Sequence, residues 1–129
     1  MEKEFVPYEQ ALALKELGFD EPCFVYWVYN GVEITFSTSH NKSGWSMIGF
    51  KNNQMDKKAG LCTAPTFSQA FKWFREKYEL YSFVFRFDEG FGYETYKEGV
   101  TQTNDSFDTY EEAELECLKK LIQITKQKQ

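Results

Sequence analysis

The segment "PTFSQAFKWFREKY" (residues 65–78) reads as the start and body of a helix, and its opening phrase occurs three times in the chain. "PYEQALALKELGF" from Pro7 and "TYEEAELECLKKL" from Thr109 repeat the order Pro or Thr, aromatic, any residue, Gln or Glu, Ala. In the central copy, Thr66 and Gln69 have the spacing of a capping box, which satisfies free backbone N–H groups at a helix start. Apolar residues then recur at steps of three and four, as on one helix face: Phe67, Ala70, Phe71, Phe74 and Tyr78.

The other two copies predict helices with different starts. Thr109 and Glu112 repeat the capping box, and lysines near the end of that segment suit the negative end of a helix dipole. Pro7 has no hydroxyl, but proline fits the first turn, where its missing N–H costs nothing. Gly18 is a typical helix terminator. We therefore expect helices over residues 8–17, 66–78 and 109–125.

Between these predicted helices, the spacing at which apolar residues recur changes from about 3.6 residues to 2 residues, which indicates strands. "CFVYWVYNGVEITFS" contains two β-rich runs around Asn30-Gly31, a strong hairpin signal, so a hairpin is expected over residues 23–38. "LYSFVFRFDEGFGYETYK" predicts a second hairpin over residues 80–97. Its alternation predicts an inward-facing aromatic row: Tyr81, Phe83, Phe85 and Phe87.

These elements predict an α+β protein made as a single domain over residues 1–129. We expect duplicated helix–β-hairpin units in the order α-β-β-α-β-β-α, forming an antiparallel sheet with helices packed mainly on one face. The alternative is that good helix starts resemble one another by convergence. Residues 39–64 form an insert between the units, rich in Asn, Lys, Gly and Ser. An insert of this length is either functional or a solvated excursion.

Composition narrows the classes of partner. The formal net charge is -5 and the chain contains two arginines, Arg75 and Arg86, so it offers few groups for phosphate binding. The sequence begins without a signal-peptide pattern, and its apolar runs are too short to span a bilayer. Three widely spaced cysteines suggest reduced thiols. We therefore expect a cytoplasmic protein that does not bind membranes.

No pattern of catalytic or metal-ligating residues stands out. The single histidine, His40, lies in a polar turn, and pairing it with Cys62 as a nucleophile has little support without a recognisable nucleophile motif. Cys23 and Cys117 lie in apolar stretches and are expected in the core. The cysteines and histidine lack zinc-site spacing. We expect no catalytic residues, no metal and no cofactor.

Aromatic residues provide the candidate binding site. Trp73 is expected at the flank of its helix stripe, near Arg75, and Trp and Arg often anchor interfaces. Together with Trp45 from the insert and Trp27 from the first hairpin, they are predicted to form a surface for a protein partner or for self-association. The alternative is that these tryptophans complete the rim of the core.

Three stretches, "PYEQALALKELGFDEPC", "APTFSQAFKWFREKY" and "TYEEAELECLKKLI", resemble those of a group of small proteins encoded by tailed phages and by Bacteroidetes that carry phage-derived genes. The likeness covers the three predicted helices. The group has no assigned activity, so the resemblance implies only a phage or prophage origin and a bacterial host cytoplasm. If the helices are the common scaffold, the strands and loops are where a binding surface would vary.

Together these observations favour a non-enzymatic protein-interaction module, a phage-derived accessory protein that binds a host or phage protein. The alternative is binding of single-stranded nucleic acid through the Lys-bearing insert and strand aromatics, although the acidic charge argues against nucleic acid. A third interpretation is a small-molecule-binding protein or enzyme, which would require a deep pocket lined by Arg86, Tyr93 and an acidic residue.

Overall fold

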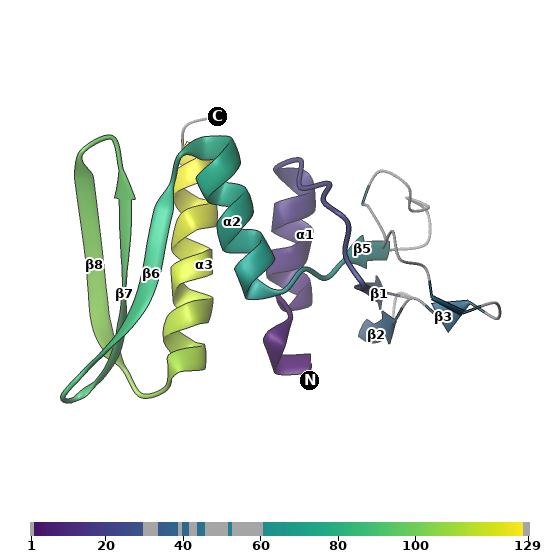
Figure 1. Cartoon of the computed structure of the whole chain (residues 1–129), viewed down its shortest axis with the longest axis horizontal. Coiled ribbons are helices and arrows are strands. Elements are labelled where there is room, and N and C mark those ends of the chain that lie inside the picture. The colour runs from purple at the N-terminus through teal and green to yellow at the C-terminus, as the bar shows by residue number, and fades with distance from the viewer. Residues whose placement is uncertain are drawn as a thin grey trace. The chain divides into compact units, whose positions relative to one another are not determined.

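The protein combines helices with antiparallel sheets, which confirms the predicted α+β class (Figure 1). The computed structural model describes residues 2–29, 34–38, 40–41, 44–45, 52 and 61–127. The chain divides into two compact units, Met1–Thr66 and Phe67–Gln129. Each unit contains a three-stranded sheet of its own, where the sequence had suggested one shared sheet.

The N-terminal unit pairs one α-helix with a sheet in the strand order β2-β1-β5. The first strand is central, as its apolar character suggests, and both of its partners run antiparallel to it. A separate two-stranded ribbon joins β3 and β4. The elements are η1 (Glu2–Glu4), α1 (Tyr8–Glu16), β1 (Val25–Tyr29), β2 (Ile34–Thr38), β3 (His40–Asn41), β4 (Gly44–Trp45) and β5 (Leu61–Thr63).

Helix α1 begins and ends close to the predicted positions. Pro7 occupies the N-cap with an extended backbone and makes no side-chain cap bond. Gly18 follows the helix with φ of 101°, a left-handed conformation that glycine adopts without strain. The Phe19 N–H donates to the Leu14 carbonyl at 2.9 Å, which closes the last turn. The sequence signals for this helix are therefore confirmed.

Polar side chains connect the segments of the N-terminal unit in its interior. Trp27 is buried, and its indole N–H donates to the Val6 carbonyl at 2.9 Å. Asn52 is also buried, and it donates to the Phe19 carbonyl and accepts from the Thr63 N–H. Because these bonds satisfy buried backbone groups, they fix the segments that surround the sheet.

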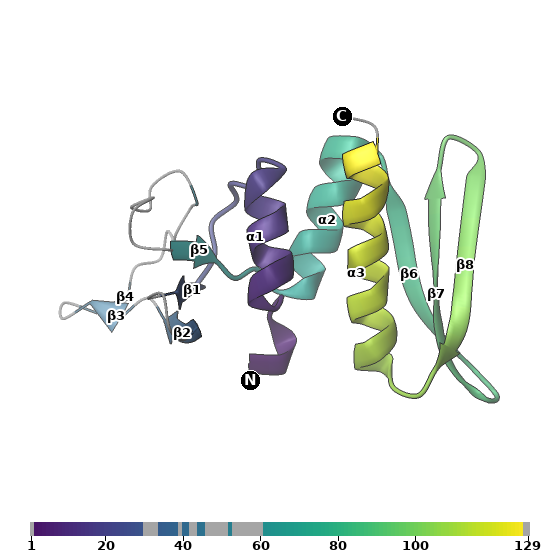
Figure 2. The same cartoon turned by 180° about the vertical axis from the view of Figure 1, so that it is seen from behind.

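The C-terminal unit contains a three-stranded meander with strand order β6-β7-β8, preceded in the sequence by one helix and followed by another. Helix α3 packs against all three strands, and α2 packs against α3 and β6. Figures 1 and 2 show α3 lying along the sheet from both sides of the unit. The elements are α2 (Phe67–Tyr78), β6 (Tyr81–Phe87), β7 (Gly90–Lys97), β8 (Val100–Phe107) and α3 (Tyr110–Gln127).

At the start of helix α3, Thr109 caps the helix as predicted, and the reciprocal bond of Glu112 goes one residue before the cap, to Asp108. The Glu112 N–H donates to the Thr109 hydroxyl at 3.1 Å, and the Glu112 carboxylate accepts from the Asp108 N–H at 3.2 Å. These bonds satisfy backbone donors at the helix start. The buried face of the helix consists of Ala113, Cys117, Leu118, Leu121, Ile122 and Thr125.

The strand register and the burial of side chains show which residues of the C-terminal sheet face α3. Ser82 pairs with Thr95 and Val84 pairs with Tyr93, and paired residues lie on the same face of a sheet. Tyr93 and Thr95 are buried. The predicted inward face was therefore wrong, because the alternate residues of β6 lie on the opposite side from α3: Tyr81, Phe83, Phe85 and Phe87.

Two further features differ from the expected layout. Strand β8 extends the second hairpin into a meander, and β5 adds a strand to the first hairpin from within the expected insert. The first strand is central in the N-terminal sheet, whereas the second is central in the C-terminal sheet. Because the two topologies differ, the proposed duplication is not confirmed. Most of the 39–64 insert lies outside the described residues.

Candidate functional site

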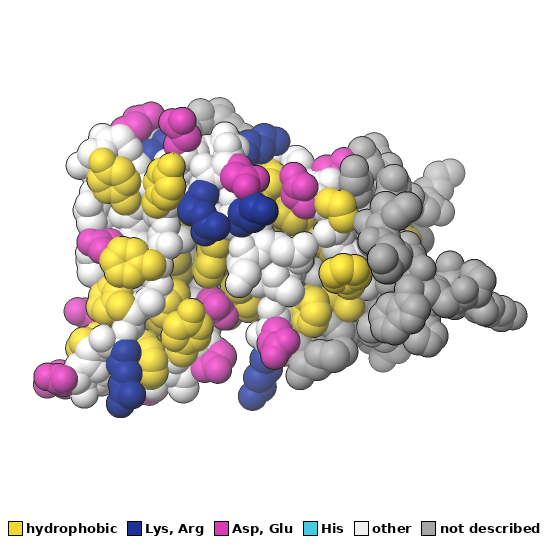
Figure 3. All heavy atoms as spheres, in the orientation of Figure 1, with side chains coloured by type: hydrophobic (Ala, Val, Ile, Leu, Met, Phe, Trp, Pro, Cys, Tyr) yellow, Lys and Arg dark blue, Asp and Glu magenta, His cyan; other side chains and the backbone are white. Residues whose placement is uncertain are grey.

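The side of the C-terminal sheet opposite α3 is rich in aromatic side chains, and we call it the open face. Three of its rings are strongly exposed: Tyr81 at 49%, Phe83 at 54% and Tyr96 at 47% of their surface. Figure 3 shows hydrophobic side chains gathered over the part of the chain that forms this sheet. The register places these residues on the open face: Tyr81, Phe83, Phe85, Phe87, Glu94, Tyr96, Thr101 and Thr103.

The phenylalanines of β6 form a continuous row along the open face. The ring centroids of Phe83 and Phe85 are 5.8 Å apart, and those of Phe85 and Phe87 are 6.2 Å apart. Both pairs are tilted by 50°, within the range that aromatic pairs favour. Because each ring is held by its neighbour, the row presents an ordered apolar surface.

Glu94 lies in the middle of this apolar surface, on the central strand. It pairs with Phe83 of β6 on one side and with Thr103 of β8 on the other. The Thr103 hydroxyl donates to the Glu94 carboxylate at 3.3 Å, which helps to orient it. An open groove of about 470 Å³ runs beside it, lined by Tyr81, Ser82, Phe83, Glu94, Tyr96 and Thr101.

The charge of the open face is acidic. The strand positions that make up the face include Glu94 and no lysine or arginine. A face of this kind can bury apolar side chains of another macromolecule and attract a cation. It lacks the basic groups that would neutralise a phosphate backbone.

Of the four residues that the sequence suggests as a binding patch, two are buried and one is exposed. Trp27 and Trp73 are buried, at 7% and 5% exposure, and they belong to different units. Arg75 is exposed on α2. The side chain of Trp45 lies outside the part of the chain that is described. Burial of the two tryptophans argues against their direct contact with a partner.

Trp73 packs as a core-rim residue of the C-terminal unit. Its ring meets Phe74 and Tyr78 edge-on, with centroids 5.1 and 5.3 Å away. The Lys77 ammonium lies 5.2 Å from the Trp73 ring, in a cation–π arrangement. This matches the alternative that the sequence left open, in which the tryptophans complete the core.

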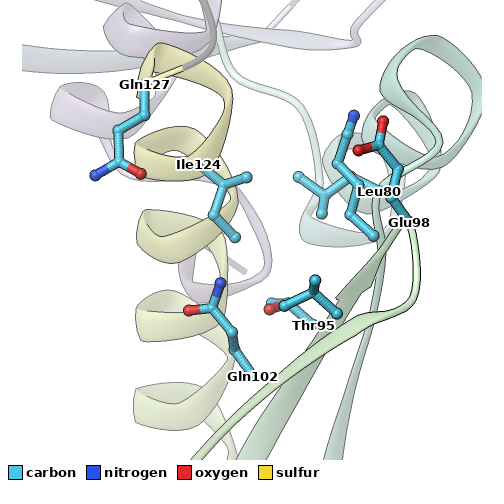
Figure 4. A pocket seen from close by; sticks show the side chains of 8 residues that line it. Leu80, Thr95, Glu98, Gln102, Ile124 and Gln127 are labelled. Carbon is cyan, nitrogen blue, oxygen red and sulfur yellow. The ribbon is translucent and has the colours of Figure 1, made fainter.

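A second, smaller pocket lies between α3 and one end of the sheet (Figure 4). Its volume of about 230 Å³ is below the range of roughly 300–1,000 Å³ that is usual for ligand pockets. The ammonium group of Lys97, which lines it, is already bound to the Tyr78 carbonyl. Neither this pocket nor the groove on the open face is lined by Arg86 or Tyr93, the residues expected for a small-molecule site.

The three cysteines are buried and have the properties of core residues. Burial raises the pKa of Cys23 and of Cys117 to about 12, and that of Cys62 to about 11. A nearby hydroxyl, from Thr63 for Cys23 and from Ser82 for Cys117, opposes this rise without cancelling it. Since the thiolate is the reactive form, these thiols are poor nucleophiles at neutral pH.

Comparisons with protein-family models, characterised proteins and solved structures found no match. Within the described residues, no group of three or more His, Cys, Asp or Glu side chains is arranged to hold a metal ion. None of the helices in the described ranges is long and apolar enough to cross a membrane. Among the described residues, the exposed rings and the central carboxylate make the open face the strongest candidate site.

The sequence contained the signal for this surface, although it was assigned to the core. The aromatic alternation of β6 identifies a face of the strand but not the side on which α3 packs. On β8, the positions of the open face include the polar Thr101 and Thr103, which could have indicated that this side of the sheet is uncovered.

Proposed function

We propose that the protein is a non-enzymatic interaction module that binds a protein partner through the open face of its C-terminal sheet. The observation that carries this proposal is the exposure of Tyr81, Phe83 and Tyr96 on one continuous face. The largest contiguous apolar patch on the surface of a protein is often an interaction site.

The chemistry of the face favours protein over nucleic acid. Aromatic rings on a sheet can stack on bases, but such sites combine stacking with a basic groove. Here a carboxylate, Glu94, takes the central position, and lysine and arginine are missing from the face. The resemblance to phage proteins supports a host or phage protein as the partner, and a bacterial cytoplasm as the place where they meet.

Site-specific photo-crosslinking tests the proposal. A photoreactive phenylalanine analogue at Phe83 is expected to give a discrete crosslinked adduct in bacterial cells. The same analogue at Val100 is the matched control, because Val100 is 58% exposed but belongs to the side of the sheet that α3 covers. It should give no such adduct.

The adduct should also depend on the neighbouring rings of the open face. Tyr81→Ser and Tyr96→Ser should each weaken the crosslink from Phe83 while changing the free energy of unfolding by about 1 kcal/mol or less, since these rings are largely exposed. Equal adducts from Phe83 and Val100, or none from either position, would contradict an interaction through the open face.

A further inference from the structure

The size and charge of the open face identify the kind of partner element that it fits. Its longest strands have 8 residues, so the face is about 26 Å long and three strands wide, with a projected area of about 350 Å². A standard protein–protein interface buries about 800 Å² of surface per partner. The flat outline of the face alone is smaller than one side of such an interface, and its length and width match a single secondary-structure element.

On the opposite side of the same sheet, the element that covers the three strands is a helix. Helix α3, with 18 residues, packs against all three strands there. A helix of that length extends for about 27 Å and has a diameter of about 10–12 Å with its side chains. A second helix of similar length would cover the open face in the same way and complete a helix–sheet–helix arrangement.

The position of Glu94 defines the charge of that helix. Because Glu94 lies on the central strand among aromatic rings, a helix laid over the face would cover its carboxylate. A buried carboxylate without a partner is costly, whereas a paired and hydrogen-bonded one is tolerated. The Thr103 hydroxyl supplies one hydrogen bond and leaves the second carboxylate oxygen for a cation.

The same carboxylate argues against a second copy of this chain as the occupant. In a two-fold dimer formed through the open face, the same patch meets itself. The two Glu94 carboxylates would then approach each other near the centre of an apolar contact, where like charges repel strongly. The formal net charge of -5 on each chain would add to this repulsion.

We propose that the open face binds an amphipathic helix of a partner protein whose apolar stripe contains one lysine or arginine that pairs with Glu94. This inference rests on the proposed function and specifies the partner's chemistry. The aromatic row of β6 supplies the apolar contact, and Glu94 supplies selectivity for a cation at one position.

A displayed library of 18-residue amphipathic helices tests the inference with the full chain as bait. The apolar positions are randomised among Leu, Ile, Phe and Met, and the central position of the stripe is Lys, Arg, Gln or Glu. Selection on the natural protein should enrich Lys or Arg over Gln at the central position by tenfold or more. Phe83→Ser, checked for native circular dichroism, should abolish the enrichment.

Charge reversal supplies the matched control. With Glu94→Lys as bait, the preference at the central position should change from Lys or Arg to Glu, and with Glu94→Gln it should disappear. If helices bind in a Phe83-dependent way but show no preference for a cation, the inference is wrong, whereas the proposed function as an interaction module still holds. If no helix is enriched over the Phe83→Ser bait, the proposal that the occupant is a helix is wrong.

Two further measurements separate the other occupants. If the full chain sediments as a dimer and Phe83→Ser abolishes the dimer, the occupant of the open face is a second copy of the chain and not a helix of another protein. Binding of a fluorescent 20-nucleotide single strand that is likewise lost in Phe83→Ser would overturn both this inference and the proposed protein partner. We expect a monomer in the first experiment and no binding in the second.

Discussion

At the scale of single residues, Asn52 shows how one side chain can connect two segments that are far apart in the sequence. Its amide group donates to the Phe19 carbonyl at 2.8 Å and its oxygen accepts from the Thr63 N–H at 2.9 Å. All of these bonds are buried, so water cannot take over if the side chain is removed. A short polar residue in a stretch that offers no periodic pattern thus connects the end of one helix segment with a strand.

We therefore predict that Asn52→Ala lowers the free energy of unfolding by about 2–4 kcal/mol, because each buried backbone group left without a partner costs about 1–3 kcal/mol. Urea denaturation followed by circular dichroism measures the change. Glu16→Ala, an exposed position on α1, is the control and should change the stability by less than about 0.5 kcal/mol. A loss as small for Asn52→Ala as for the control would contradict this role.

At the scale of elements, a β-bulge shapes the end of the C-terminal sheet. Between β7 and β8 the register shifts from Phe91 opposite Phe107 to Tyr93 opposite Asn104. One extra residue of β8 is therefore accommodated next to Gly92, and Ser106 adopts a positive φ of 80° there. Such a bulge increases strand twist and ends regular pairing near the start of α3.

Gly92 is required at this bulge because its neighbours approach closely. A Cβ atom at Gly92 would lie 2.8 Å from the Asn104 carbonyl oxygen and 2.9 Å from the Phe85 ring. We predict that Gly92→Ala destabilises the protein by about 1–3 kcal/mol through overpacking. Chemical denaturation with urea measures the loss.

Gly99 provides the control for this substitution. It has φ of 83° at the turn between β7 and β8, and a side chain there would meet no atom within 4 Å. Gly99→Asn should cost less than about 1 kcal/mol, since asparagine tolerates left-handed backbone better than most residues. If Gly92→Ala proves as mild as Gly99→Asn, the bulge accommodates a side chain and the close approach is not limiting.

The sequence predicted elements where the physics is local. The capping box of Thr109 and Glu112 and the glycine stop at Gly18 involve neighbours within a few residues, so the helices were found almost to their ends. Hairpin pairing of β1 with β2 and of β6 with β7 follows the same logic. These signals require no knowledge of tertiary packing.

The sequence failed where the outcome depends on what covers a surface. Strand β8 is polar on both faces and is exposed almost throughout, so it shows none of the apolar alternation that identifies a strand. Apolar alternation usually marks the buried side of a strand, so the sequence predicts that the aromatic row of β6 lies in the core. In fact the small Ser82 and Val84 lie beneath α3, opposite Thr95 and Tyr93. Their fit against a helix cannot be read from β6 alone.

At the scale of the whole molecule, the C-terminal unit has two unequal sides. One side of its sheet is covered by α3, with Leu118 and Leu121 fully buried. The other side exposes the rings of Tyr81, Phe83 and Tyr96. A helix–sheet pair with one helix layer leaves such a face available, and the site is therefore a consequence of the architecture as much as of its residues.

The candidate site itself could be predicted only in part. Its residue types were visible in the sequence, and an excess of aromatics led to the expectation of a binding surface. Trp often anchors interfaces, which favours the tryptophans as binding residues, but large rings also fill cores, and Trp27 and Trp73 do so here. Exposure is a property of the assembled sheet, and the pattern of β6 alone does not report it.

The C-terminal unit contains the elements needed to fold by itself. All partners of β6, β7 and β8 lie within residues 67–129, and so does α3, which covers one side of their sheet. We predict that a fragment of residues 67–129 folds and gives a dispersed amide NMR spectrum. Its free energy of unfolding should not exceed about 3–5 kcal/mol, because a unit of this size buries a small core.

A second fragment, residues 67–108, is the matched control because it retains the whole meander but lacks α3. Without that helix, Tyr93 and Thr95 lose their cover, so this fragment should be unfolded in the same NMR measurement. The folded fragment should also keep the Phe83-dependent binding of helical peptides, since its open face is complete. A fragment 67–129 that is unfolded where the full chain is folded would show that this unit depends on the rest of the chain.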